Sequence, residues 1–280
     1  MLPYRRSGIL VLLLALYLGI GAGGLAAADT GEIVRRATAG LAADWAADPT
    51  YSSIERDETQ NGKEVTSKTF QVLMIDGSEY HLPLAENDQP LPPDRQKAEL
   101  VKLKTEVQRR QSESPAERQE RIDEWKKRRD EEGELLLDFN SALTFEFLRE
   151  EVKDGHAAYV LAGTPKKGLK PTTRSAKVLA GIKGTAWVEK DQMHPMRVEC
   201  LVVTPVPVFG PLAHVLPGTR IEIEMTPVGE STWLIDEVSM ELKVSKLGLF
   251  KSTQMTRSTY KQYRPNSEVL AELLTGDAPK

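Results

Sequence analysis

Cysteine is almost absent from this sequence, and so are the residue patterns that accompany catalysis. The only thiol among 280 residues is Cys200, so no disulfide can form within the chain. The four histidines lie far apart, without the His-Glu-x-x-His spacing of a zinc site. There is no Gly-x-Ser-x-Gly nucleophile elbow and no Gly-x-x-x-x-Gly-Lys phosphate loop. We therefore expect a protein that is not an enzyme, holds no cofactor and no metal, and is stabilised by packing alone.

An excess of charge of one sign is also absent. The chain has 37 Lys and Arg against 41 Asp and Glu, a net charge of −4. Nucleic-acid binding needs concentrated positive charge, so this composition argues against it. Charge is densest at 94–132, where twelve basic and eleven acidic side chains are interspersed at helical spacing. We expect one or two solvated helices there, broken near 112–115 and inserted across a sheet, with docking of a partner protein as the alternative.

The longest apolar run, at 9–20, belongs to a pattern typical of a secretory signal peptide. Arg5 and Arg6 give residues 1–28 a positive start, and small side chains end the segment at Ala28. The run is shorter than the roughly 20 residues needed to span a bilayer. We expect cleavage after Ala28 and export to the periplasm, with an uncleaved membrane anchor as the alternative.

The segment that follows is predicted to be a helix. Asp29 and Glu32 have the spacing of a capping box, with Asp in place of the usual Ser or Thr, and Asp48 and Pro49 end the helix. Apolar residues recur on one face of it: Ile33, Ala37, Leu41 and Trp45. This helix therefore needs an apolar surface to lie against.

Strand patterns dominate the rest of the chain. Residues 51–58 predict a first strand, and 68–84 predict a hairpin that turns at Asp76 and Gly77. Short connections between the later strands indicate an antiparallel meander. Polar residues on the last strand indicate an edge strand. The later strands are expected at 144–147, 157–163, 177–189, 196–204, 219–227, 231–244 and 250–263.

These patterns together predict a mainly β protein with helices, of the α+β class. Its sheet is expected to be a curved antiparallel sheet or incomplete β-barrel, covered by the N-terminal helix and the charged insertion. The expected organisation is a signal peptide at 1–28, a helix with the first strands at 29–93, the charged insertion at 94–132, the β meander at 133–264 and a C-terminal tail at 265–280.

Two individual side chains are interpreted from their local context. Cys200 alternates with apolar Val198 and Val202, which indicates a buried thiol that packs as a small hydrophobic group. His194 precedes Pro195 in a predicted turn, so we expect it to be exposed to solvent.

A curved sheet with one apolar face can leave a cavity beneath its covering helices, and such a cavity suits acyl chains or an extended peptide. The alternative is an ordinary filled core, which only the volume can distinguish. Trp187 is a candidate whose strand has Ala186 and Val188 on its other side. The candidates for the cavity wall are Trp45, Phe145, Phe147, Trp187, Ile221, Ile223, Met225, Val238, Met240 and Leu242.

One segment of this β region resembles a known family. Residues 184–191, Gly-Thr-Ala-Trp-Val-Glu-Lys-Asp, are similar to a strand in which Gly-x-x-Trp, an apolar residue and an acid lead into a turn and a returning strand, here 195–203. That strand is found in the LolA/LolB-like lipoprotein-carrier superfamily, which includes RseB/MucB-type domains. The segments 61–91 and 154–161 are also similar to a broader set of exported bacterial proteins.

The resemblance implies an incomplete antiparallel barrel plugged by helices, which binds or senses lipid-modified or acylated ligands. The implied partners are lipid or lipoprotein acyl chains, an envelope protein, and a membrane surface in peripheral contact. The charged insertion at 94–132 departs from the compact carriers and puts a simple shuttle role in doubt. The leading hypothesis is a non-catalytic periplasmic binding or carrier module. The alternatives are an interaction or regulatory subunit and a hydrolase whose carboxylates converge only in the fold.

Overall fold

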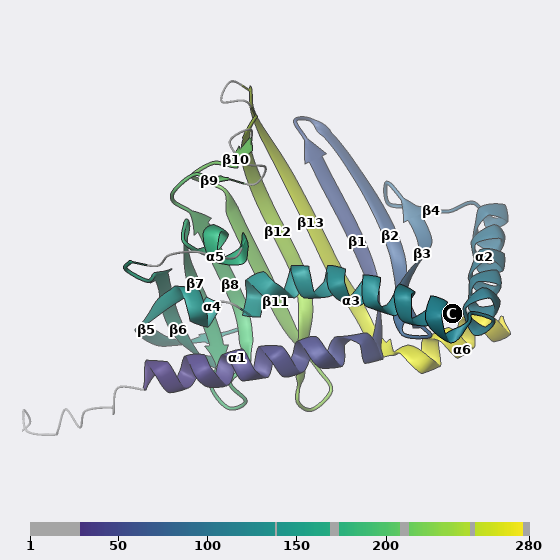
Figure 1. Cartoon of the computed structure of the whole chain (residues 1–280), viewed down its shortest axis with the longest axis horizontal. Helices are drawn as coiled ribbons and strands as arrows, with labels where there is room; N and C mark the ends of the chain where they lie inside the picture. Colours follow the sequence, from purple (N-terminus) through teal and green to yellow (C-terminus); the bar gives the residue numbers. More distant parts are fainter. Residues whose placement is uncertain (1–28, 138, 169–173, 208–212, 247–249, 277–280) are drawn as a thin grey trace, which may run out of the picture.

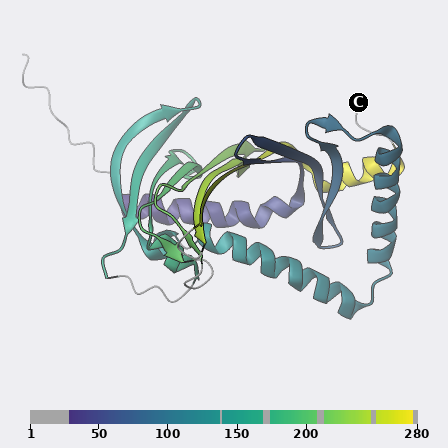
Figure 2. The ribbon, with the colours of Figure 1, turned by 90° about the horizontal axis from the view of Figure 1, so that it is seen from above.

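One large curved antiparallel sheet, with helices on its concave face, organises the chain (Figures 1 and 2). This confirms the predicted α+β class and the open, curved sheet. The expected signal peptide lies outside the described residues. The computed structural model describes residues 29–137, 139–168, 174–207, 213–246 and 250–276.

Most neighbouring strands of the sheet also follow each other in the sequence. The long-range exception is the pairing of the first strand with the last. The sheet order is β4-β3-β2-β1-β13-β12-β11-β8-β7-β6-β5; β10 also pairs with β12, and β9 pairs with β10. The bounds are β1 (Tyr51–Asn61), β2 (Glu64–Ile75), β3 (Ser78–Glu86), β4 (Gln89–Pro90), β5 (Leu143–Lys153), β6 (His156–Pro165), β7 (Ile182–Glu189), β8 (Pro195–Val202), β9 (Val206–Pro207), β10 (Ala213–Val215), β11 (Arg220–Val228), β12 (Thr232–Lys246) and β13 (Phe250–Pro265).

The last strand lies in the middle of the sheet, so the prediction of an edge strand was wrong. β13 pairs with β1 from Tyr51 opposite Pro265 to Asn61 opposite Gln254, and with β12 on its other side. The polar residues that suggested an edge come from both faces of this long strand. They are tolerated because the concave face is polar where β13 and β1 meet, as Asp57 opposite Ser258 shows.

The first hairpin turns where the sequence predicted. Asp76 and Gly77 both have positive φ, 46° and 90°, and connect β2 to β3. These values are those of a type I′ turn, whose twist matches that of the flanking strands. By contrast, the predicted strand at 177–189 begins late, because α5 (Arg174–Leu179) occupies its first residues.

The helices lie against the concave face and one end of the sheet. Asp29 caps α1 by accepting hydrogen bonds from the backbone N–H groups of Gly31 and Glu32, as its position predicted. In Figures 1 and 2, α1 and α3 cross the same face. The helices are α1 (Thr30–Ala47), the 3-10 turn η1 (Asp48–Thr50), α2 (Pro93–Gln111), α3 (Pro115–Leu137), α4 (Phe139–Ala142), α5, and α6 (Asn266–Thr275).

The charged segment forms two helices that break where expected. Ser114 and Glu117 form a capping box at the start of α3, and α2 packs Leu103 and Val107 against β2 and β3. The C-terminal residues, expected to be a tail, form α6, which packs Val269 into the same core. No described helix combines the length and apolar composition that a bilayer crossing requires.

Arg110 fixes α2 to the first hairpin. Its guanidinium is buried and donates hydrogen bonds to the carbonyl oxygens of Ile75, Ser78 and Glu79. We expect Arg110→Lys to lower the free energy of unfolding by about 1–3 kcal/mol, because an ammonium group cannot reproduce this fork of donors. Chemical denaturation measures the change. Arg109→Lys, at an exposed neighbour, is the matched control, and equal losses in the two variants would contradict this role.

Candidate ligand cavity

A cavity of about 780 Å³ lies between the concave face of the sheet and the helices α1 and α3. Its walls include side chains from α1, α3 and strands on both sides of the central β1–β13 pair. Small-molecule sites occupy roughly 300–1,000 Å³, so this space is of the size that holds a ligand. The filled core that the sequence left as an alternative is not what the structure contains.

The part of the cavity beneath α1 is apolar. Val34 and Ala37 of α1 pack on Leu161 and Val188 of the sheet, and this contact closes the cavity along one edge of the helix. Apolar side chains from α1 and from seven strands line this part: Val34, Ala37, Leu41, Val72, Leu143, Phe145, Leu161, Ala186, Val188, Val198, Cys200, Ile223, Met225 and Leu234.

Two glycines keep space open on the floor of this apolar part. Gly163 on β6 and Gly184 on β7 face each other across the strand pair, and both line the cavity. A Cβ atom on Gly184 would lie 2.9 Å from the carbonyl oxygen of Glu199, and one on Gly163 would lie 3.1 Å from the ring of Phe145. Side chains at these positions would therefore clash with neighbours as well as reduce the volume.

Cys200 belongs to this apolar wall, as its alternation with valines predicted. It is 9% exposed, and burial raises the pKa of its thiol to about 12. Burial therefore disfavours the thiolate, which is the nucleophilic form of cysteine.

The opposite end of the cavity, beside β1 and β3, is polar. His81 lies between two carboxylates, with Nδ1 3.7 Å from Oε2 of Glu55 and Nε2 3.8 Å from Oε2 of Glu79. Tyr260 donates a hydrogen bond to Glu55, and the indole of Trp125 donates one to Glu79. We call Glu55, Glu79, His81 and Tyr260 the polar end of the cavity.

The pKa values in the polar end reflect burial and the imidazole. Glu55 is only 8% exposed, and this burial raises the pKa of its carboxyl group, with nearby Asp57 adding to the effect. The contact with Glu79 raises the pKa of His81 and lowers that of Glu79. The cavity thus holds a carboxyl group that desolvation makes harder to ionise, beside an imidazole that its neighbours make easier to protonate.

A cationic residue of α3 closes the cavity above the polar end. The guanidinium of Arg129 lies 4.2 Å from the ring centre of Trp45. It donates hydrogen bonds to the carbonyl oxygen of Trp45 and, at 3.3 Å, to Oδ2 of Asp48. Gly133 allows the close approach of α3 to α1, because a Cβ atom there would lie 2.8 Å from the Trp45 ring.

A buried hydrogen-bond network fixes α1 to the sheet. Oδ2 of Asp44 lies 2.6 Å from Nδ1 of His194, and Oδ1 accepts the backbone N–H of Trp233 at 3.0 Å. The His194 ring also stacks on Trp233. The prediction of an exposed His194 was wrong, because this side chain is 7% exposed. The turn itself depends on neighbouring residues, but its burial depends on α1, which covers it and is distant in the sequence.

The ten candidates from the sequence are distributed between the cavity and its surroundings. Trp45, Phe145, Ile223 and Met225 line the cavity. Trp187 faces the other side of the sheet, where its indole donates to Glu151. The others lie outside the lining: Phe147 packs beside α1 and Ile221 beside Cys200, while Val238, Met240 and Leu242 are half-buried on β12.

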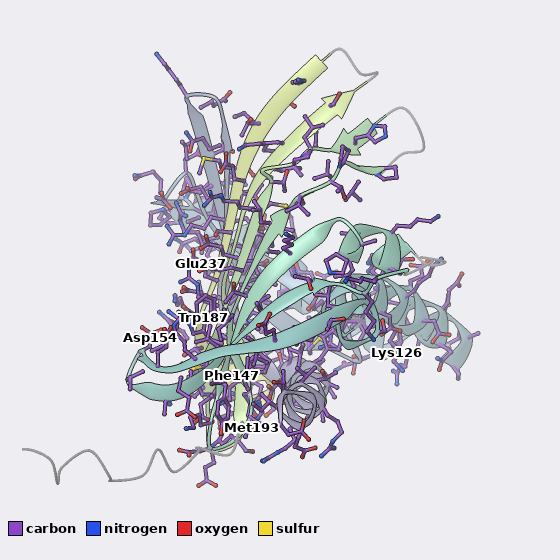
Figure 3. All side chains as sticks on the ribbon, turned by 90° about the vertical axis from the view of Figure 1, so that its left-hand side faces the viewer. Lys126, Phe147, Asp154, Trp187, Met193 and Glu237 are labelled. Carbon is purple, nitrogen blue, oxygen red and sulfur yellow. The ribbon has the colours of Figure 1, made fainter. Side chains whose placement is uncertain are left out.

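Figure 3 shows this division directly. Phe147 and Met193 lie beside α1, whereas Trp187 and Glu237 lie on the side of the sheet that faces away from the helices. The alternation of β7 had indicated this, since Ala186 and Val188 line the cavity.

Sequence reasoning missed the polar end altogether. Glu79 and His81 alternate with Tyr80 and Leu82 on β3, and a polar strand face of this kind has the same sequence pattern whether it lies in water or in a cavity wall. The packing of α3 over this strand makes the difference, and no local signal reports it. Within the described ranges, no group of three His, Cys, Asp or Glu side chains is arranged to hold a metal ion.

The fold and the cavity define a class: an α+β protein whose open, curved antiparallel sheet encloses a cavity under its helices. No family model matches the sequence, and no curated protein matches it. Among solved structures, an outer-membrane lipoprotein-sorting protein domain from Vibrio parahaemolyticus is similar at 12% identity, covering 88% of this chain and 97% of that one, with a TM-score of 0.37.

Two further structures show the range of these matches. A LolA superfamily protein from Nitrosomonas europaea has 13% identity, covers 81% of this chain and 92% of its own, and has a TM-score of 0.32. The MucA/MucB complex from Pseudomonas aeruginosa has 12% identity, coverage of 87% and 97%, and a TM-score of 0.22. The names of the first two structures, a lipoprotein-sorting protein domain and a LolA superfamily protein, fall within the superfamily that the sequence resembles. Matches with TM-scores this low do not indicate a ligand or a partner for this chain. The cavity is the observation that bears on its ligand.

Proposed function

We propose that this protein is an exported, non-catalytic binding or carrier module for a lipid-like amphiphile or an acylated protein segment. The observation that carries the proposal is the cavity of about 780 Å³ with an apolar lining beneath α1. The proposed location is the periplasm, on the strength of the signal-peptide pattern at 1–28.

The shape of the lining suits one apolar chain with a polar group at its end. Apolar side chains such as Leu161, Val198 and Ile223 surround the part beneath α1, and charged groups occur at the end near β1 and β3. Burial of an alkyl chain yields about 0.8 kcal/mol per methylene group, so the apolar part supplies affinity. The polar end then determines which head group is accepted.

The test is uptake of amphiphiles that share a head group and differ in chain length. Each additional pair of methylene groups is expected to tighten binding by about 1.6 kcal/mol, or roughly fifteenfold, until the chain exceeds the cavity. Displacement of a fluorescent fatty alcohol analogue from the mature protein measures this, and mass spectrometry of the native protein identifies any lipid that accompanies it. Affinity that is independent of chain length would refute the proposal.

Partner docking through α2 and α3, the alternative from the sequence, has less support. Many of their charges already pair with each other, as Glu106 does with Arg109 and Arg110, and Glu113 with Arg121. Arg121 also donates to Ser78 on the first hairpin. These contacts favour a structural role for the charged insertion, which closes the cavity with α3.

A further inference from the structure

The charges in the cavity wall do not balance at the polar end. Elsewhere they do: Asp44 pairs with His194, and Asp48 pairs with Arg129. Arg128, the other basic residue of α3 in the lining, is exposed to solvent. Glu55 and Glu79 therefore share the imidazole of His81 as their ion-pair partner, while Arg129 attracts Glu79 from a greater distance.

Glu55 is the group for which this imbalance matters most. Its side chain is 11% exposed, and within the described part of the chain its one ion pair is with His81, at 3.7 Å. The charged groups that act most strongly on its carboxyl group are Asp57, His81 and Glu79. Asp57, two residues further along the same face of β1, adds negative charge and lies opposite Lys68 at the exposed rim.

A buried carboxylate that lacks a full cationic partner is costly, and a cation from a ligand would remove that cost. Hydrogen bonds between an ammonium group and carboxylates are also stronger than those between neutral groups. An anionic head group would instead meet two carboxylates, of which Glu55 is buried and Glu79 is 39% exposed, so repulsion from Glu55 is less screened than it would be in open solvent.

From this geometry we infer that the polar end of the cavity, with Glu55 and Glu79 on either side of His81, selects an amphiphile that carries a protonated amino head group. The inference rests on the proposed function, since the alkyl chain of the same ligand lies in the apolar part beneath α1. It adds the chemical class of the head group, which the apolar lining leaves open.

The experiment compares dodecylammonium, dodecanol and dodecanoate, which share one alkyl chain, in binding to the mature protein below their aggregation concentrations. Dodecylammonium is expected to bind on the order of tenfold more tightly than dodecanol, and dodecanoate more weakly than both. Glu55→Gln is expected to remove the preference for the amine, so that the variant binds dodecylammonium and dodecanol with similar affinity. Glu58→Gln is the matched control on the same strand, because Glu58 pairs with Arg56 outside the cavity lining.

The outcomes separate this inference from the proposed function. Binding of dodecanol without a preference for the amine overturns the inference and leaves the proposed function standing. Failure to bind any of the three compounds overturns both. If Glu55→Gln also loses dodecanol, Glu79→Gln takes its place in the comparison. An amine preference that persists in a carboxylate variant that still binds dodecanol, or that disappears in Glu58→Gln, refutes the assignment to the polar end.

Discussion

Ala186→Trp is expected to abolish the binding of long-chain amphiphiles. Ala186 lies on β7 in the cavity wall, between Thr185 and Trp187, and its methyl group faces the space beneath α1. An indole there would occupy the volume of several methylene groups of the ligand. The loss of about four buried methylene groups corresponds to about 3 kcal/mol, or roughly a hundredfold in affinity.

Displacement of a fluorescent fatty alcohol analogue measures this loss, and far-ultraviolet circular dichroism shows whether the sheet is retained. The matched control is Val152→Trp, which adds an indole to β5 at a position that is 75% exposed. The control should bind as the unchanged protein does. If a folded Ala186→Trp variant binds long chains normally, the ligand does not occupy this cavity.

Asp44→Ala should cause the largest loss of stability among the substitutions considered. Removal of the carboxylate leaves Nδ1 of His194 and the backbone N–H of Trp233 buried without their acceptor. Breaking a buried pair of this kind typically costs about 3–5 kcal/mol. For a domain of this size, such a loss lowers Tm by roughly 10 °C.

Differential scanning calorimetry tests this expectation. Asp44→Asn keeps an oxygen that can accept the Trp233 N–H, so it should lose less stability than Asp44→Ala. Arg36→Ala, at an exposed position on the same helix, should stay within about 0.5 kcal/mol of the unchanged protein. A similar Tm for Asp44→Ala and Arg36→Ala would mean that the network does not hold α1 in place.

Much of the fold follows from local signals in the sequence. The capping position of Asp29 and the turn at Asp76 and Gly77 each depend on a few neighbouring residues, and the structure has both. The break between the charged helices is of the same kind, because Ser114 and Glu117 cap α3. Such features are predictable because their physical causes lie within a few residues.

Features that depend on distant contacts were not predictable in the same way. The central position of β13 follows from its pairing with β1, which local alternation does not encode. His194 is buried because α1, far away in the sequence, supplies Asp44. The polar end of the cavity exists because α3 covers β1 and β3, and a polar strand face under a helix has the same sequence pattern as one in water.

The pairing of β1 with β13 has a consequence for how the chain acquires its structure. Ser52 pairs with Arg264, so the two central ladders of hydrogen bonds cannot be completed until nearly the whole polypeptide is available. Contacts between residues so distant in sequence slow folding, because the intervening loop must close before they form. Before β13 is available, no strand joins β1 to β4 with β5 to β12, so the cavity between them forms only when this last strand pairs with both β1 and β12.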